Sequence, residues 1–347
     1  MFLMRPAGPG DLEAILELAR FLDSPNLPAE EGFLAARLER SEASFCQSAP
    51  PSEEWEYQFA LVDETERVIG TCVILSKHGT PEMPHLFLRV REEERHSDSL
   101  DVRVTHVTLQ LGASYDGPSE LGALILHPDV RGRPGQPGKL LSWGRLAFMA
   151  RHLGAFEPTV LAEMRAAIDD EGHSAFWGAF GRHFTGISYA EADRRSATDK
   201  SFVLDLFPDT PFYASLLDET ATRQLGKVHD EALPALHLLE SAGFRWIGEI
   251  DPFDGGPFVG AAVSEITPIQ RSVAGTLAAG TPADTAPAMI VSTEEGGRFR
   301  ATVAPASADA DEIRIPKEAR KRLELNIGEE VALTPLPPPS QAREKRG

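Results

Sequence analysis

The chain has 347 residues, of which 53 are acidic and 34 basic, and its formal net charge is −19. This length allows two compact domains and an accessory module. An acidic surface repels a phosphate backbone, which argues against general nucleic-acid binding, whereas it suits a cationic substrate. Cys46 and Cys72 are too few for a disulfide scaffold and lack metal-ligand spacing, so we expect no metal site.

The amino-terminal residues 1–6 lack a basic segment followed by a long apolar run, so they do not resemble a signal peptide. No stretch approaches the roughly 20 apolar residues that are needed to span a bilayer. We therefore expect a cytoplasmic protein with no membrane partner.

The N-terminal part, residues 1–165, shows helical and strand patterns in a definite order. A short strand at 2–5 precedes two helices, one capped by Asp11 and one after Pro28. The remaining patterns predict strands at 57–62, 68–75, 102–111, 121–126 and 160–165, and a helix at 139–152. Residues 76–101 are polar and charged and fit no pattern. This order describes a mixed α+β fold rather than a doubly wound dinucleotide fold.

The rest of the chain divides by composition. We expect residues 166–271 to form a second, related α/β half with helices around 213–225 and 234–242 and a strand at 246–250. An Ala-, Gly-, Thr- and Pro-rich linker should cover 272–287. A small β-rich module around a helix at 317–323 is predicted for 288–336, and a disordered tail for 337–347.

The most informative local feature is a strand, a glycine-rich turn and a helix start within residues 124–139. Amides at a helix start point outward without partners, and the macrodipole adds positive charge, so a pyrophosphate can bind there if glycines allow close approach. Arg131, Arg133 and Lys139 strengthen this field. The turn is neither a Walker A loop nor a dinucleotide fingerprint. A simple tight connection is the alternative, because Gly and Pro mark any turn.

The spacing Arg-x-x-x-Gly-x-x-Gly from Arg131 to Gly138 resembles the acetyl-CoA turn of the GNAT superfamily. Within that superfamily, residues 1 to about 270 resemble the arginine N-succinyltransferase family, which includes subunits acting on ornithine. The similar segments follow the family's order and spacing; they are 5–6, 11–12, 26–29, 119–129, 162–165, 174–177, 181–184, 211–213 and 253–257.

The resemblance implies a GNAT-like acyltransferase core that moves a succinyl group from succinyl-CoA, or another acyl group from its CoA thioester, to the α-amine of arginine in arginine catabolism. It also implies a set of acyl-CoA-binding residues, some on the strand and some on the turn. These are Leu124, Ile125, Leu126, Arg131, Gly135, Gly138 and Lys139.

His229 matches the histidine that is the proposed proton donor of this family, so the resemblance implies the same role here. Its unperturbed pKa of about 6.5 suits proton transfer near neutrality. Without the resemblance, a loop histidine capping the following helix is the alternative. Attack of an amine on a thioester calls for a neutral amine, an electrophilic carbonyl and a protonated leaving thiolate, and general acid–base help is typically worth about 10²–10⁴ in rate.

An arginine acceptor calls for carboxylates that face the guanidinium and a cation that faces the substrate carboxylate. Glu163 and Arg165 alternate with apolar neighbours and can share one face of a strand, and Asp254 lies beside a glycine turn. A planar guanidinium favours bidentate carboxylate pairing. Structural salt bridges are the alternative for all three residues.

Three positions depart from the usual family pattern: Pro137 in the turn, Ala232 where a threonine is usual, and Gly260 near a usual glutamate. They leave a second hypothesis open, a catalytically weakened or regulatory subunit. Residues 313–331 resemble half of an AbrB-type barrel, which could serve DNA binding or dimerisation, but extended family members end in a comparable module. We therefore favour a structural role and expect a homodimer or a heterodimer with a homologue, acting on a small amino acid.

Overall fold

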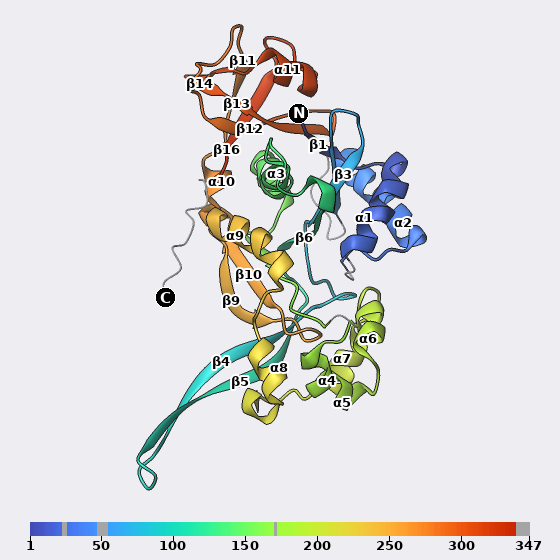
Figure 1. Ribbon diagram of the computed structural model, residues 1–347, viewed down its shortest axis with the longest axis vertical. Helices are drawn as coiled ribbons and strands as arrows, with labels where there is room; N and C mark the ends of the chain where they lie inside the picture. Colours follow the sequence, from blue (N-terminus) through green and yellow to red (C-terminus); the bar gives the residue numbers. More distant parts are fainter. Residues whose placement is uncertain (23–25, 47–54, 170–171, 338–347) are drawn as a thin grey trace.

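The computed structural model describes residues 1–22, 26–46, 55–169 and 172–337 (Figure 1). Its sixteen strands form one sheet in the order β14-β15-β11-β16-β12-β13-β1-β2-β3-β6-β7-β10-β9-β4-β5-β8. The strands are β1 (Leu3–Pro6), β2 (Glu56–Val62), β3 (Val68–Leu75), β4 (His85–Ser97), β5 (Val102–Ser114), β6 (Ser119–Leu126), β7 (Thr159–Glu163), β8 (Phe212–Tyr213), β9 (Arg245–Ile250), β10 (Pro257–Ala262), β11 (Val273–Leu277), β12 (Ala288–Glu295), β13 (Arg298–Pro305), β14 (Ser307–Asp309), β15 (Glu312–Arg314) and β16 (Glu330–Pro335). The helices are α1 (Leu12–Leu22), α2 (Glu31–Cys46), α3 (Pro137–Arg151), α4 (Ala175–Ala179), α5 (Gly181–Thr185), α6 (Tyr189–Ser196), α7 (Ser201–Leu206), α8 (Glu219–Gln224), α9 (Leu233–Ala242), α10 (Thr267–Gln270) and α11 (Lys317–Leu323).

Helices cover both faces of the central strands, α3 on one face and α1 with α2 on the other (Figure 1). Along β3, Cys72 and Ile74 belong to the core under α3, while Val73 belongs to the core under α1 and α2. This alternation follows from the period of two in a strand, where successive side chains point to opposite faces. Both faces of these strands are therefore shielded from solvent.

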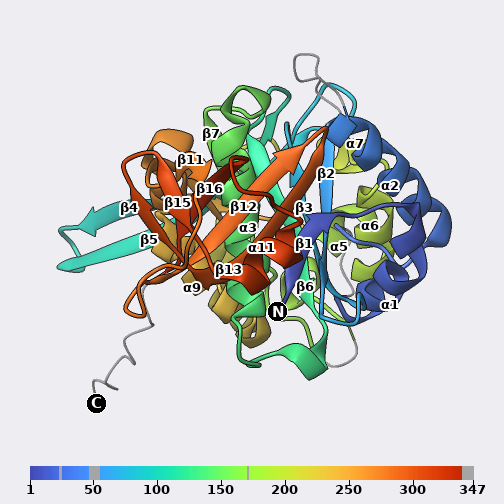
Figure 2. The ribbon, with the colours of Figure 1, turned by 90° about the horizontal axis from the view of Figure 1, so that it is seen from above.

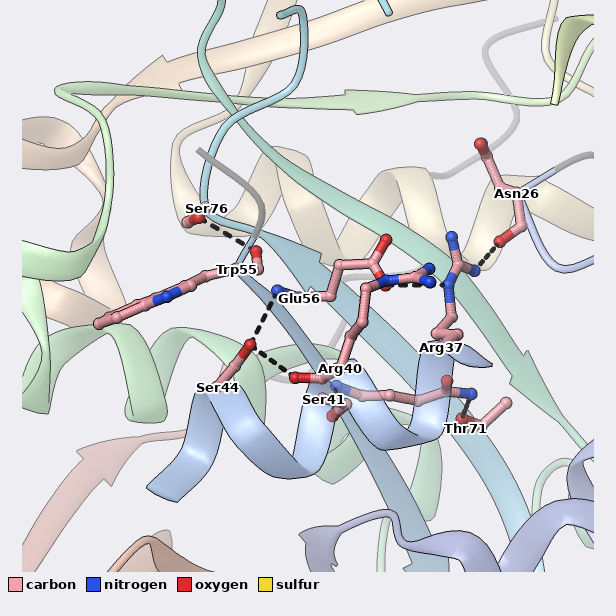
Figure 3. A network of polar contacts seen from close by, with 10 residues as sticks. Asn26, Arg37, Arg40, Ser41, Ser44, Trp55, Glu56, Thr71 and Ser76 are labelled. Carbon is pink, nitrogen blue, oxygen red and sulfur yellow. Dashed lines mark hydrogen bonds and ion pairs between the residues drawn. The ribbon is translucent and has the colours of Figure 1, made fainter. Parts of the chain in front are cut away.

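Polar contacts fasten α2 to the first residues of β2 (Figure 3). The carboxylate of Glu56 lies 3.5 Å from Arg37 Nε and 3.1 Å from an Arg40 terminal nitrogen. Arg37 is buried and also donates to the carbonyl oxygen of Asn26 at 2.5 Å. The Ser41 hydroxyl accepts the backbone amide of Gln58 at 2.8 Å. These bonds hold the middle of α2 against β2 and against the loop that precedes the helix.

A second group of helices packs on the far part of the sheet. Trp177 and Phe176 of α4 share one apolar cluster with Leu86, Leu109 and Ile250. Beyond this cluster β4 and β5 run on as a two-stranded arm that projects from the body (Figure 1). The arm occupies much of the segment that fitted no sequence pattern, because both faces of its outer half meet solvent and no apolar alternation is needed there.

The part predicted as a second half, residues 166–271, does not form a sheet of its own, since β9 and β10 pair with β4 and β7. The helical prediction around 213–225 is confirmed for α8 and for a 3₁₀ turn at Ala214–Leu216. Phe212 and Tyr213 instead pair with Leu109 and Thr108 of β5, so sheet pairing overrides the helical pattern there.

The C-terminal module extends the same sheet beyond β1 (Figure 2). Its strands and α11 enclose an apolar cluster that includes Val291, Ile313 and Leu323. The predicted linker differs from the structure at its start, where β11 pairs with β16, because Val273 to Leu277 adds a strand to the module. The tail predicted to be disordered lies outside the described residues except for residue 337. No helix in the described ranges is long and apolar enough to cross a membrane.

Candidate acyl-CoA and acceptor site

Two parallel strands of the central sheet diverge and form a fork. Among the described residues, β6 and β7 pair at only two positions, Ser119 with Val160 and Glu120 with Leu161. Beyond these pairs β6 continues along β3 and β7 along β10, so their facing edges separate. Unpaired strand edges present free amides and carbonyl groups. The fork can therefore take an extended ligand between its arms.

A bulge lies on the β6 arm of the fork. The register with β3 shifts opposite Cys72, and Ala123 has a positive φ of 48°. A bulge leaves an extra residue outside the ladder and redirects its backbone groups. Leu124 follows, partly exposed, while the side chains of Ile125 and Leu126 are buried. The predicted acyl-CoA strand thus offers its backbone, rather than its side chains, to the fork.

The predicted phosphate turn leads from β6 into α3 and is open to solvent. Gly135 and Gln136 have φ values of 92° and 59°, which bend the chain sharply before the helix begins. The amide of Leu140 bonds to the Gln136 carbonyl at 3.0 Å, so the amides of Gly138 and Lys139 lie in the open first turn. Pro137 occupies the first helical position, where a proline loses no intrahelical bond.

His229 lies beside the end of the β7 arm. Its backbone amide donates to the Arg165 carbonyl at 2.9 Å, and Val228 forms a bridge with Ala166. The ring is half-buried, and its Nδ1 accepts the Glu231 amide at 3.2 Å. The neutral ring therefore carries its proton on Nε2.

A salt bridge joins the His229 loop to the phosphate turn. Arg131 lies 3.7 Å from the carboxylate of Glu231, and its Nε donates to the Leu126 carbonyl at 3.4 Å. The structure thus brings together three predicted parts, the strand end at Leu126, the turn and His229.

The three predicted acceptor residues differ in how they are held. Strand β7 ends at Glu163, and Arg165 lies beyond it, where its guanidinium donates to the Leu22 carbonyl at 3.4 Å. Both carboxylate oxygens of Asp254 accept backbone amides, from Ala166 at 3.0 Å and Gly256 at 2.7 Å. Asp254 therefore shapes the end of the fork, while Glu163 has the freer carboxyl group.

Two buried carboxyl groups that act on Glu163, those of Asp251 and Glu120, were not predicted from the sequence. Burial raises the pKa of Glu163 well above its ordinary value, and Asp251 and Asp254 add to the rise. Burial, with Asp254 as neighbour, also raises the pKa of Asp251. Lys200, at the start of α7, counteracts both shifts. Asp251 and Glu120 could have been noticed as single acidic residues at the edges of apolar strands.

The other two departures from the family pattern have distinct settings. Ala232 is one turn after His229 and its amide donates to the His229 carbonyl at 2.9 Å. Gly260 lies buried in β10, where an added Cβ would meet Ile247 at 3.0 Å and the Val160 carbonyl at 3.3 Å. The first position borders the site, and the second accommodates close strand packing.

Comparison with known proteins bears on the whole chain. A family model described as arginine N-succinyltransferase beta subunit matches residues 2–268, and one described as the C-terminal domain of that subunit matches residues 271–335. The arginine N-succinyltransferase subunit beta of Pseudomonas aeruginosa is 35% identical over 348 residues, covering 99% of this chain and 100% of that protein. An Escherichia coli arginine N-succinyltransferase is 35% identical over 341 residues, covering 97% and 98%.

A solved structure agrees with these sequence matches. Subunit AI of the arginine/ornithine succinyltransferase from Pseudomonas aeruginosa has a TM-score of 0.83 at 29% identity, covering 96% of this chain and 98% of that one. The predicted α+β class with an acyltransferase core and a small β-rich module is confirmed. Because the family models account for the core and the module alike, the chain belongs to the arginine N-succinyltransferase family.

Proposed function

We propose that this acyltransferase moves a succinyl group from succinyl-CoA to the α-amine of arginine, or of a close relative such as ornithine, in arginine catabolism. The observation that carries the proposal is the convergence of the β6–β7 fork, the open start of α3 and His229. The names of the similar proteins supply the acyl group and the acceptor.

Acyl-CoA binding is assigned to the backbone. The diphosphate lies on the amides of Gly138 and Lys139, with Gly135 allowing close approach and Lys139 adding charge. Arg131 flanks the turn, where its ion pair with Glu231 holds it beside the His229 loop. The thioester arm follows Leu124 to Leu126 into the fork, and a β6 amide at the bulge can hold the carbonyl oxygen as it gains negative charge.

The reaction is an amine attack on a thioester. The neutral α-amine forms a C–N bond with the carbonyl carbon while the C–S bond breaks. The leaving sulfur takes the Nε2 proton of His229, whose tautomer is fixed by the Glu231 amide. The nitrogen that becomes the amide gives up one proton, which replaces the donated one, so the ring ends the cycle as it began.

The acceptor is assigned to the side of the fork where the carboxyl groups lie. Glu163 faces the cationic side chain, and Arg165 is the candidate for the substrate carboxylate. Asp254 contributes by holding the backbone of Ala166 in place.

Thiol release from succinyl-CoA tests the proposal. Arginine should stimulate release by the wild-type protein, and His229→Ala should lower kcat by about 10²–10⁴. His96→Ala, on the exposed arm, is the matched control and should leave the rate unchanged. Full activity of His229→Ala would refute the role of this ring, and the absence of arginine-dependent release by the wild type would refute the acceptor.

The alternative of a DNA-binding tail finds less support. Within the basic helix α11, Arg322 pairs with Glu66 and donates to the Asp63 carbonyl, so it serves to attach α11 to the core. The Pseudomonas relatives are named as subunits, which supports an oligomeric enzyme. A homodimer or heterodimer and a cytoplasmic location stay predictions.

A further inference from the structure

A chain of polar side chains leads from the fork toward the surface. Glu120 Oε2 lies 2.7 Å from His78 Nδ1, and His78 Nε2 lies 3.1 Å from His85 Nδ1. His85 Nε2 is 3.9 Å from the carboxylate of Glu249, which accepts a bond from exposed Arg89 at 2.9 Å. Glu120 and His85 are only 1% and 3% exposed. The reaction described above uses none of these groups.

Glu120 lies at the base of the fork, and its carboxylate extends over Gly122 of the same strand. It belongs to the last residue pair before β6 and β7 separate. The next residue on the same face of β6 is Gly122, where an added Cβ would meet Glu120 Oε1 at 3.6 Å and, within 4 Å, only that carboxyl group. The face above Gly122 is therefore open except for this carboxylate. Oε1 has no hydrogen-bond partner in the described part of the chain.

The surroundings of Glu120 keep its carboxylate charged although it is buried. Burial alone would raise its pKa, but His78, Lys200 and His85 outweigh this effect and lower the pKa to about 2. Arg37 and Arg145 face it from α2 and α3, and Glu163 faces it from β7.

The Lys200 ammonium is shared among carboxyl groups, since it acts on Glu120, Glu163 and Asp251 alike. A buried carboxylate oxygen without a hydrogen-bond donor is costly, and a bound cation removes that cost.

We propose that Glu120 is a specificity residue that binds the side-chain cation of the acceptor, and that His78 and His85 are positioning residues that aim its free oxygen into the fork. The proposal rests on the proposed function for the identity of the acceptor. Glu163, two residues beyond the partner of Glu120 on the other arm, completes a carboxyl pair for a planar guanidinium.

The spacing along β6 suits this assignment. Leu124 at the bulge lies four positions after Glu120, roughly 13 Å of extended strand. The carboxylate shortens this distance because it leans over Gly122. An extended arginine with its α-amine at the bulge can therefore place its guanidinium at Glu120. A role as the base that deprotonates the α-amine suits Glu120 less, because a carboxylate held so firmly in its charged form accepts protons poorly.

Calorimetry with arginine and with its neutral analogue citrulline tests the proposal, with CoA present so that no acyl transfer occurs. The wild type should prefer arginine. Glu120→Gln should weaken arginine binding roughly 10- to 100-fold, as expected for a hydrogen bond to a charged group, and leave citrulline binding nearly unchanged. Glu120→Asp keeps the charge and should retain part of the preference. Glu92→Gln, an exposed acid on the arm, controls for net charge.

Two further variants protect the test from a folding defect. His78→Gln and His85→Gln keep Glu120 and should reduce the arginine preference to a smaller degree, with CoA affinity unchanged. The proposal would be overturned if Glu120→Gln preferred arginine over citrulline as strongly as the wild type does, or if it lost affinity for both ligands equally. If Glu120→Gln does not fold, an unchanged arginine preference in both histidine variants would overturn it. Because binding is measured without turnover, a failure of succinyl transfer would be seen separately.

Discussion

At the level of single side chains, a local hydrogen bond sets the tautomer of His229, whereas burial and like charge set the pKa of Glu163. His229 keeps its proton on Nε2 because the Glu231 amide occupies Nδ1, so the position of the proton is set by one local hydrogen bond. The pKa of Glu163 is raised because burial penalises its charged form and because the carboxyl groups of Asp251 and Asp254 disfavour a further negative charge. Adding a cation beside Glu163 reverses that balance.

This balance predicts a proton release on acceptor binding. The pKa of Glu163 is raised above its ordinary 4.5, so the free protein holds this proton to higher pH. A guanidinium favours the ionised carboxylate, so arginine affinity should increase as pH rises through the raised pKa. Calorimetry in buffers of different ionisation enthalpy would measure the released proton. Glu163→Gln should abolish the release, and proton uptake on binding would contradict the assignment.

At the level of elements, the position of α2 depends on one buried ion pair. Arg37 is buried with Glu56 and the Asn26 carbonyl as partners, whereas Arg40 reaches the same carboxylate from the exposed side of the helix. Burial lowers the pKa of Arg37, and the Glu56 charge opposes that shift. Removal of a buried partner leaves an uncompensated charge, while an exposed pair is screened by water.

The two arginines therefore form a matched pair of variants. Arg37→Ala should lower the free energy of unfolding by about 3 kcal/mol, because Glu56 loses its buried partner. Arg40→Ala should lower it by less than about 1 kcal/mol. Urea unfolding at neutral pH measures both. Equal losses in the two variants would show that the helix does not depend on the buried contact.

At the scale of the whole molecule, the C-terminal module is part of the acyltransferase core. Ile290 and Phe299 of the module lie in the same apolar cluster as Phe148 of α3 and Phe59 of β2. Phe299 packs edge-on against Phe148, with ring centroids 5.3 Å apart. The sheet also runs without a break from β13 into β1. Core and module should therefore unfold together.

A substitution in the module tests whether core and module unfold together. Phe299→Ala should lower stability by about 3–5 kcal/mol, as buried aromatic truncations do. Differential scanning calorimetry should show one transition in the wild type and one, shifted downward, in the variant. Leu100→Ala at the exposed tip of the arm is the control and should leave the transition in place. Two separate transitions, with only one affected, would mean that the module folds independently.

The sequence predicted most of the elements whose patterns are local. The strand–turn–helix unit at 124–139 and the strand at 68–75 were predictable because a glycine turn or an apolar run marks each. The arm and the β11 strand were not, because a solvated ribbon and a short five-residue strand carry no such pattern. Within the site, the residue pattern supplied the turn and the resemblance supplied His229. The link from Glu120 to His85 joins residues that only the folded sheet brings together.

A structure determined with CoA and arginine bound tests the central claim most directly. We predict that the diphosphate lies on the amides of Gly138 and Lys139, that the sulfur enters the fork within reach of His229 Nε2, and that the guanidinium lies on the Glu163 side. A diphosphate bound elsewhere, or a sulfur beyond the reach of His229, would contradict the account.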